Sequence, residues 1–265
     1  MRPTHSRRGT PLARRCPACL AVADGAARFC GRCGHEFPPT REQLPEHAWS
    51  AFKPALVLWL LLLGTNLLLG LWLRTADSDS PAGDVLVTLL SALFVVGFVR
   101  GAPDAVAPRL AHAGFDARSW WLVPAVLAGL WAWMAGCFTV LDWLGAETQR
   151  YVDEYAAHGW PAWSAFLIIA VCPAIFEELA FRGVIQHRLE ELLDVRDAWL
   201  VQAAMFSVLH LAPLNFVSHF GMGLAFGWLR NRTGSLVPGM AAHFAWNAWI
   251  VASEYGGWSW APGLG

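Results

Sequence analysis

Residues 161–187 read PAWSAFLIIAVCPAIFEELAFRGVIQH, an apolar stretch that carries two adjacent glutamates and one arginine. A stretch of about 20 apolar residues is long enough to cross a bilayer as a helix. Ionisable groups are costly there, so Glu177, Glu178 and Arg182 each require a structural or a chemical reason. Side chains four residues apart meet on one face of a helix. We therefore predict a Glu178–Arg182 pair that leaves Glu177 free as a base; a purely structural ion-pair cluster is the equal alternative.

The rest of the chain continues the apolar pattern. Of its 265 residues, 56% are hydrophobic and 15% are charged, whereas a soluble domain carries about 25% charged residues. This composition disfavours a water-soluble enzyme and a disordered chain. Six further apolar stretches are interpreted as membrane-spanning helices in the same way. They lie at residues 54–73, 84–99, 120–144, 198–211, 213–229 and 236–253. We predict an all-α, polytopic transmembrane bundle of about seven spans.

The charge distribution predicts the orientation of this bundle. Residues 1–53 hold nine basic and four acidic side chains, and the remainder holds ten basic and sixteen acidic ones. With the N-terminus in the cytoplasm, 16 of the 19 basic residues lie on the cytoplasmic side, as the positive-inside bias requires. The basic residues comprise 18 arginines and one lysine, a usage that favours a GC-rich bacterial genome. We expect a multi-pass protein of the bacterial inner (plasma) membrane.

Two Cys-x-x-Cys pairs precede the first apolar stretch. Their members are Cys16, Cys19, Cys30 and Cys33. Four thiolates at this spacing can surround a Zn²⁺ ion as a tetrahedron. Because few apolar residues lie nearby, the metal would have to supply the folding energy. The pattern predicts a small ribbon with structural zinc.

Polar side chains also occur in the last predicted spans. A single histidine in an apolar helix, such as His210, is more often a packing residue than a catalyst. His243 and Asn247 lie four residues apart, so they offer a donor pair or two metal ligands on one helix face. Unsatisfied polar groups are expensive in hydrocarbon, so we expect these groups to converge with those of residues 177–182. His219 is expected to be a polar cavity residue, and Pro173 to kink its helix.

The polar residues described above form three short motifs along the chain. They are EExxFR at 177–182, FxxxH at 206–210 and HxxxN at 243–247. Over residues 160–250 the chain resembles the CPBP family, which comprises CAAX prenyl endopeptidases, bacteriocin-processing enzymes and Abi proteins. The resemblance implies intramembrane peptidase activity.

The same resemblance implies a role for each motif residue. Glu177 would be the general base that activates water, and His210 would orient that water. His243 and Asn247 would bind the oxyanion or ligate a metal. Glu178 and Arg182 would support them.

A catalytic metal is left open by the sequence. Glu177, His210 and His243 could form a three-ligand site with one open position. The chain has no HExxH sequence, and asparagine is an uncommon zinc ligand. The resemblance favours hydrolysis by glutamate without an obligatory metal.

We divide the chain accordingly into five parts. They are a cytoplasmic zinc ribbon with a basic tail (1–37), a linker (38–53), N-terminal membrane helices (54–145), a peptidase core (146–253) and a tail (254–265). The core is expected to open near the cytoplasmic face, although His210, near the outer end of its predicted span, fits that placement poorly.

The expected function is hydrolysis of a peptide bond in a membrane-associated or prenylated substrate, in contact with membrane lipid. A non-catalytic scaffold or regulator that recruits partners through the ribbon is the main alternative. A transporter is disfavoured because no repeated halves are visible. A nucleic-acid partner rests only on the basic ribbon and is disfavoured as well. Substrate identity and oligomeric state are not predicted.

Overall fold

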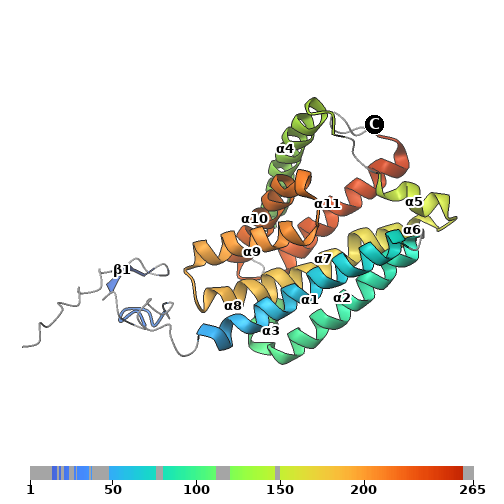
Figure 1. Ribbon diagram of the computed structural model, residues 1–265. Helices are drawn as coiled ribbons and strands as arrows, with labels where there is room; N and C mark the ends of the chain where they lie inside the picture. Colours follow the sequence, from blue (N-terminus) through green and yellow to red (C-terminus); the bar gives the residue numbers. More distant parts are fainter. Residues whose placement is uncertain are drawn as a thin grey trace, which may run out of the picture.

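The chain folds as an all-α bundle with a small two-stranded element near its N-terminus (Figure 1). The computed structural model describes residues 14–16, 18, 21–23, 27, 29–35, 37, 48–75, 80–111, 120–146 and 150–258. Together with its long apolar helices, this architecture confirms the predicted all-α membrane bundle.

The helices follow one another with short connections. The first half contains α1 (Ala48–Thr75), α2 (Pro81–Gly101), α3 (Pro103–Ala111), α4 (Leu122–Trp143) and α5 (Tyr151–Ala157). A continuous helical stretch then comprises α6 (Ala162–Ala165), η3 (Phe166–Val171), α7 (Cys172–Glu177), η4 (Glu178–Ile185) and α8 (Gln186–Glu190). The chain continues through α9 (Val195–Leu209), η5 (Pro213–Asn215), α10 (Phe216–Thr233) and α11 (Val237–Gly256). The segments η3 and η4 are π-helical, and η5 is a 3₁₀ turn.

Four helical segments of the described chain are long and apolar enough to cross a membrane. They are Ala48–Trp72, Pro81–Gly101, Leu122–Trp143 and Ala162–Glu190. The other three predicted spans are helices too. Helix α9 has only 15 residues, whereas α10 and α11, with 18 and 20 residues, are long enough but not apolar enough, so the predicted count of seven is not confirmed. The first span also begins earlier than expected, because α1 starts at Ala48 within the predicted linker.

The length of α9 accounts for the position of His210. Its 15 residues rise only about 22 Å as an α-helix, whereas the hydrocarbon core is about 30 Å thick. A helix that begins at one membrane face and has this length ends inside the bilayer. Directly after it, Leu211 adopts φ +51°, a left-handed conformation that is uncommon for a residue other than glycine. The chain reverses at this point, before η5 and α10.

Local signals define several helix ends. The Ser80 hydroxyl accepts a hydrogen bond from the Ala82 N–H at 3.3 Å, and Pro81 occupies the first helical position of α2, a favourable start for a helix. Asp194 caps α9 in the same way through the Asp197 N–H at 2.9 Å. At the other end, α10 stops at Gly234 with φ +69°, where glycine avoids the steric cost of a side chain.

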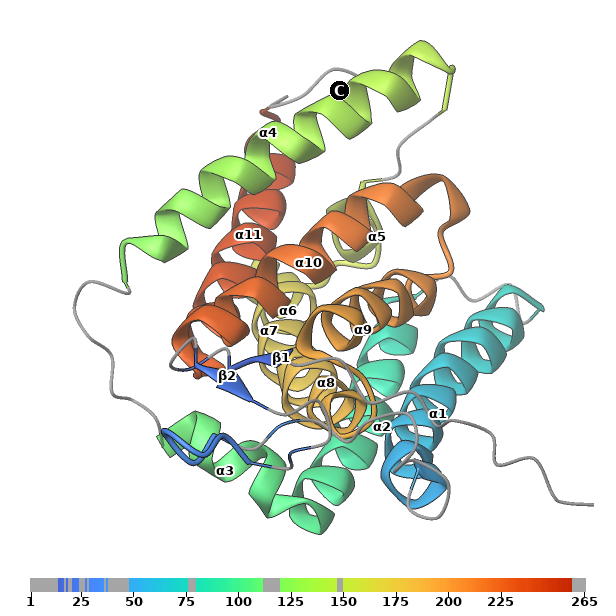
Figure 2. The same ribbon diagram turned by 90° about the vertical axis from the view of Figure 1, so that its left-hand side faces the viewer.

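The stretch Ala162–Glu190 lies in the middle of the bundle, with the α1–α2 hairpin on one side and α9, α10 and α11 on the other (Figure 2). Helix α4 crosses over α10 and α11. The Trp59 indole N–H of α1 donates to the Met205 carbonyl of α9 at 2.9 Å and ties the two sides together. The core between them buries Leu58, Phe181 and Phe206 completely. This packing surrounds the polar residues of the central stretch.

Candidate active site

The predicted Glu178–Arg182 pair is present at the centre of the bundle. The Arg182 Nη1 donates to Glu178 Oε1 at 3.0 Å, and both residues are fully buried. A second guanidinium nitrogen, Nη2, donates to the Gly223 carbonyl of α10 at 3.3 Å. The rings of Phe206 and Phe226 lie 4.5 and 5.4 Å from the guanidinium carbon, within the range of a cation–π interaction. Carboxylate, carbonyl and aromatic contacts together compensate a charge that burial would otherwise make costly.

His243 of α11 lies between the two glutamates. Its Nδ1 is 3.0 Å from Glu178 Oε1, and its Nε2 is 3.9 Å from Glu177 Oε2. A carboxylate can only accept at neutral pH, so the short contact requires a proton on Nδ1. The ring also stacks on Phe226, with centroids 4.9 Å apart. Arg182, Glu178, His243 and Glu177 therefore form one chain of charged and polar contacts that joins the first motif to the third.

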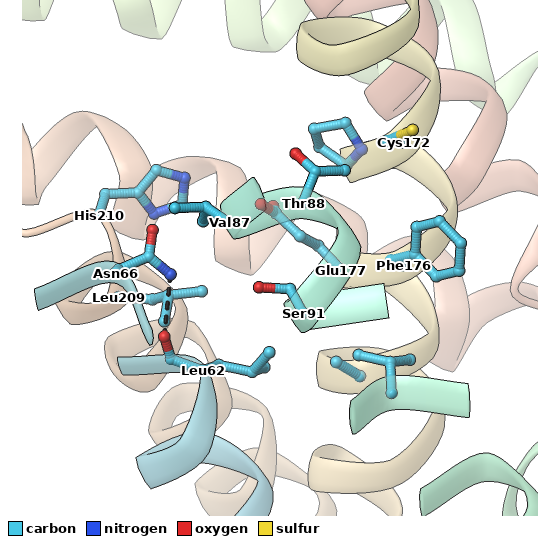
Figure 3. A pocket seen from close by; sticks show the side chains of 13 residues that line it. Leu62, Asn66, Val87, Thr88, Ser91, Cys172, Phe176, Glu177, Leu209 and His210 are labelled. Atoms are coloured by element: carbon cyan, nitrogen blue, oxygen red, sulfur yellow. Dashed lines mark hydrogen bonds between the residues drawn. The ribbon is translucent and has the colours of Figure 1, made fainter. Parts of the chain in front are cut away.

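Glu177 faces a cavity of about 110 Å³ (Figure 3). His210 lines the same cavity from the end of α9. The Glu177 side chain is 25% exposed, and its Oε2 has no hydrogen-bond partner among the described residues. The structure thus brings the first and second motifs together around a space large enough for water.

His210 is held by its own helix and by a second histidine. Its Nδ1 is 2.9 Å from the Phe206 carbonyl, and because a carbonyl can only accept, Nδ1 carries the proton and Nε2 keeps a lone pair. The ring of His219 on α10 packs against it in a tilted arrangement, with centroids 4.0 Å apart and an interplanar angle of 36°. The His219 Nδ1 is likewise 2.9 Å from the Asn215 carbonyl. No partner for His219 was predicted; the reversal at Leu211 brings the two rings together.

Asn247 contacts the central stretch rather than the cavity. Its Nδ2 donates to the Ile169 carbonyl at 2.9 Å. In a regular α-helix the N–H of residue 173 would donate to this carbonyl, but residue 173 is a proline and has no N–H. Pro173 lies in α7 between the π-helical segments η3 and η4, and such segments are frequent at functional sites. Of the motif residues, only Glu177 and His210 line the cavity.

The three expected ligands of a catalytic metal do not form a compact group. Within the described ranges, two sets of at least three His, Cys, Asp or Glu residues bring their ligand atoms within 4.8 Å of one another, and Glu177, His210 and His243 are not one of them. Glu177 and His243 do approach each other, at 3.9 Å. The geometry joins these two residues and leaves His210 on the far side of the cavity.

Asp104, His187 and Glu191 form one of the two compact sets. The His187 Nε2 lies 3.7 Å from Asp104 and 3.6 Å from Glu191. Its Nδ1 lies 3.2 Å from Arg109 Nη2. Burial, and to a lesser extent the charge of Arg230, lowers the pKa of Arg109 to about 10, so its guanidinium is still charged at neutral pH and donates to Nδ1. The proton of the neutral ring then sits on Nε2, which faces the carboxylates as a donor and does not suit a metal ion.

Cys16, Cys30 and Cys33 form the other set. Strands β1 (Arg14–Arg15) and β2 (Val22–Ala23) pair on either side of the turn that follows Cys16. The Sγ atoms of Cys16 and Cys33 are 3.6 Å apart. The fourth predicted ligand, Cys19, lies outside the described residues. Three thiols in this arrangement can hold a metal ion.

Three polar residues of the cavity were not predicted. Asn66 on α1 and Thr88 and Ser91 on α2 line it together with Glu177. The available signal was their presence inside predicted spans, where polar groups are costly, but the motifs drew attention to the second half of the chain.

Comparison with known proteins finds one family model that is similar to the central and C-terminal part of the chain. Residues 159–249 match the family model of type II CAAX prenyl endopeptidases described as Rce1-like. No curated protein and no solved structure matches the chain. The matched segment contains the three motifs in full. Residues 159–249 are therefore similar to the Rce1-like family of type II CAAX prenyl endopeptidases, in agreement with the resemblance that the order of the motifs predicted.

Proposed function

We propose that the chain is an intramembrane endopeptidase in which Glu177 activates a water molecule for attack on a peptide bond. One observation carries this proposal: Glu177 and His210 line the same cavity between membrane helices, and Glu177 Oε2 has no hydrogen-bond partner among the described residues. A carboxylate with a free oxygen beside a space of this size is suited to act as a general base.

The proposed reaction uses the chain's own side chains. A water in the cavity donates one hydrogen bond to Glu177 and the other to the lone pair of His210 Nε2, which directs a water lone pair at the substrate carbonyl carbon. Glu177 takes a proton as the new C–O bond forms and the carbonyl becomes an oxyanion. Glu177 then returns that proton to the nitrogen as the C–N bond breaks. The products are a carboxylic acid and an amine, so atoms and protons balance.

His243 is proposed to stabilise the negative charge. With Nδ1 donating to Glu178, a second proton on Nε2 would make the ring an imidazolium ion, and this N–H would point toward Glu177 and the reacting centre. Glu178 and Arg182 hold the ring in this orientation from behind. The family resemblance assigns Asn247 to the oxyanion as well. Its Nδ2 keeps a second N–H after bonding to Ile169, but Asn247 does not line the cavity in this structure, so the proposed role requires its side chain to move when substrate binds. Donors fixed in advance are most effective where water is largely excluded.

The substrate proposed is a membrane-associated peptide. The matched family is described as acting on CAAX prenyl proteins, so a prenylated C-terminal peptide is the first substrate to try. We further propose a bacterial plasma membrane with the N-terminus in the cytoplasm, where Cys16, Cys19, Cys30 and Cys33 hold a structural zinc ion.

The decisive experiment compares protein termini in membranes that contain wild type or Glu177→Gln at equal abundance. The amide keeps the shape of the side chain and cannot accept the proton, so peptide ends that depend on the enzyme should disappear. Asp153→Asn is the matched control, because this carboxylate is exposed on α5. Termini that are identical in wild type and Glu177→Gln, with both proteins folded, would overturn the proposal in favour of a scaffold.

A further inference from the structure

The α1–α2 hairpin contributes three polar side chains to the cavity that faces Glu177. Asn66 comes from α1, and Thr88 and Ser91 come from α2 (Figure 3). All three are half-buried. The remaining hairpin residues that line the cavity are apolar: Leu62, Val87 and Val95. The hairpin therefore adds a group of three polar side chains to the cavity that Glu177 and His210 also line.

These polar groups have hydrogen-bonding capacity that the protein does not use. Asn66 Nδ2 donates to the Leu62 carbonyl at 2.9 Å, which leaves its Oδ1 without a partner among the described residues. The hydroxyls of Thr88 and Ser91 likewise have no partner in the described part of the chain. An unpaired polar group between membrane helices costs free energy, so these three groups favour a ligand that can pair with them.

Hydroxyls elsewhere in the bundle behave differently. Thr65, next to Asn66 on α1, donates to the Leu61 carbonyl at 2.8 Å. Thr139 on α4 donates to the Ala135 carbonyl at 2.7 Å. A hydroxyl in a helix usually satisfies itself in this way, by bonding to the carbonyl four residues earlier. Thr88 and Ser91 do not, which distinguishes them from polar residues that are merely tolerated in a span.

The spacing of the three groups suits a peptide backbone. Thr88 and Ser91 are three residues apart, so they lie on one face of α2 and are displaced by about 4.5 Å along its axis. An extended peptide presents a carbonyl and an N–H at every residue, with a rise of about 3.3 Å. Two hydroxyls that can donate or accept, with the Asn66 carbonyl oxygen on the neighbouring helix, can therefore pair with successive groups of one strand.

We propose that Asn66, Thr88 and Ser91 form a subsite that binds the backbone of an extended peptide substrate and holds its scissile bond against Glu177. This inference rests on the proposed function. The subsite comes from α1 and α2, outside the segment 159–249 that matches the family, so the hairpin positions the substrate while the family core performs the chemistry. Recognition through the backbone selects an extended, locally unfolded segment rather than a particular side chain.

The test uses Asn66→Leu, Thr88→Val and Ser91→Ala in the full-length protein, with Thr65→Val and Thr139→Val as matched controls. The probe is a fluorescent peptide that ends in an S-farnesylated CAAX sequence. Its cleavage gives KM and kcat, and its fluorescence anisotropy with the same variants in the Glu177→Gln background gives Kd without turnover. We expect each subsite variant to raise KM and Kd by about threefold to tenfold, the effect of one lost hydrogen bond. The controls should leave both unchanged.

The two readouts separate this inference from the proposed function. Cleavage with unchanged KM and Kd in all three variants would overturn the subsite and leave the peptidase intact. Peptide binding that weakens in the variants, without cleavage by wild type, would support the subsite and refute the peptidase. No binding by wild type or by Glu177→Gln would overturn the subsite directly. Ser91→Ala removes a single oxygen and keeps the test valid if Asn66→Leu does not fold.

Discussion

The cysteine module at residues 16–37 and the helical core at residues 159–249 both depend on polar side chains, for opposite reasons. Among its described residues, the module buries Cys16, Cys30 and Phe37 as its apolar cluster, which is too small to offset the entropy of folding. The proposed metal ion, held by its cysteines, would therefore have to supply the stability of the module. The core already has a large apolar cluster, and burying its charged side chains lowers the free energy of unfolding. Polar groups that a fold does not need for stability are the ones to examine for chemistry.

Metal removal should have the largest effect, and only on the module. Structural zinc contributes about 10–16 kcal/mol to comparable small domains, so a chelator added to the full-length protein should unfold residues 16–37. Hydrogen exchange should rise to unfolded rates there and stay slow in α9 and α11, with loss of one zinc per chain by elemental analysis. Cys16→Ser should reproduce the effect, and Cys137→Ser in α4 should not. Protected module amides in metal-free protein would refute a structural metal.

Breaking the buried ion pair should have the next largest effect, in the core. Arg182→Leu leaves Glu178 buried without its cation, which we expect to cost about 3–5 kcal/mol of unfolding free energy. Thermal unfolding in detergent would measure it, with Arg196→Leu at an exposed position of α9 as the control. Adding Glu178→Leu to Arg182→Leu should recover much of the stability and none of the activity. Equal losses for Arg182→Leu and Arg196→Leu would contradict a special role for the pair.

A smaller effect is expected at Gly239, where α11 approaches the ion pair. A Cβ atom there would lie 3.0 Å from Glu178 Oε2, so Gly239→Ala should crowd the carboxylate and cost about 1–3 kcal/mol. Gly129→Ala on α4 is the matched control, because its Cβ would meet nothing within 4 Å. The difference in unfolding temperature between the two variants is the measurement. A Gly239→Ala protein as stable as Gly129→Ala would show that the carboxylate has room to move.

The smallest effect is expected for His219, which acts only through His210. Losing the stacked ring should cost about 0.5–1.5 kcal/mol, so His219→Ala should lower kcat/KM about twofold to tenfold. His219→Phe keeps a ring and should restore most of the activity. His158→Ala removes a histidine that follows the last residue of α5 and does not line the cavity, and it serves as the control. If the phenylalanine variant were no better than the alanine variant, stacking would not be what positions His210.

The sequence predicted those features that depend on neighbouring residues along the chain. The Glu178–Arg182 pair followed from a spacing of four residues, and the helical type of each long apolar stretch followed from its composition. The match over residues 159–249 followed from the order of three motifs. These are local patterns, which a single sequence carries directly.

The features that escaped prediction depend on how distant segments meet. Asn66 and Thr88 reach the cavity only because the α1–α2 hairpin packs against the central stretch. The contact of His219 with His210 depends on the chain reversal at Leu211. Leucine rarely adopts a left-handed conformation, so the residue type did not predict this reversal. The Asn247 bond to the Ile169 carbonyl depends on a packed pair of helices as well. Such contacts become visible only once the helices are assembled.

The shortness of α9 has a consequence for how the protein is made. A segment of 15 residues that carries a buried glutamine, Gln202, is a poor candidate for entering a bilayer alone. Gln202 finds its hydrogen-bond acceptor in the Gly223 carbonyl of α10, at 2.9 Å. During synthesis α9 should therefore wait at the insertion machinery until α10 emerges, and the two should enter the membrane as one hairpin. If the ribosome stalled before α10 was synthesised, α9 should remain outside the bilayer, on the side of the membrane where it was synthesised.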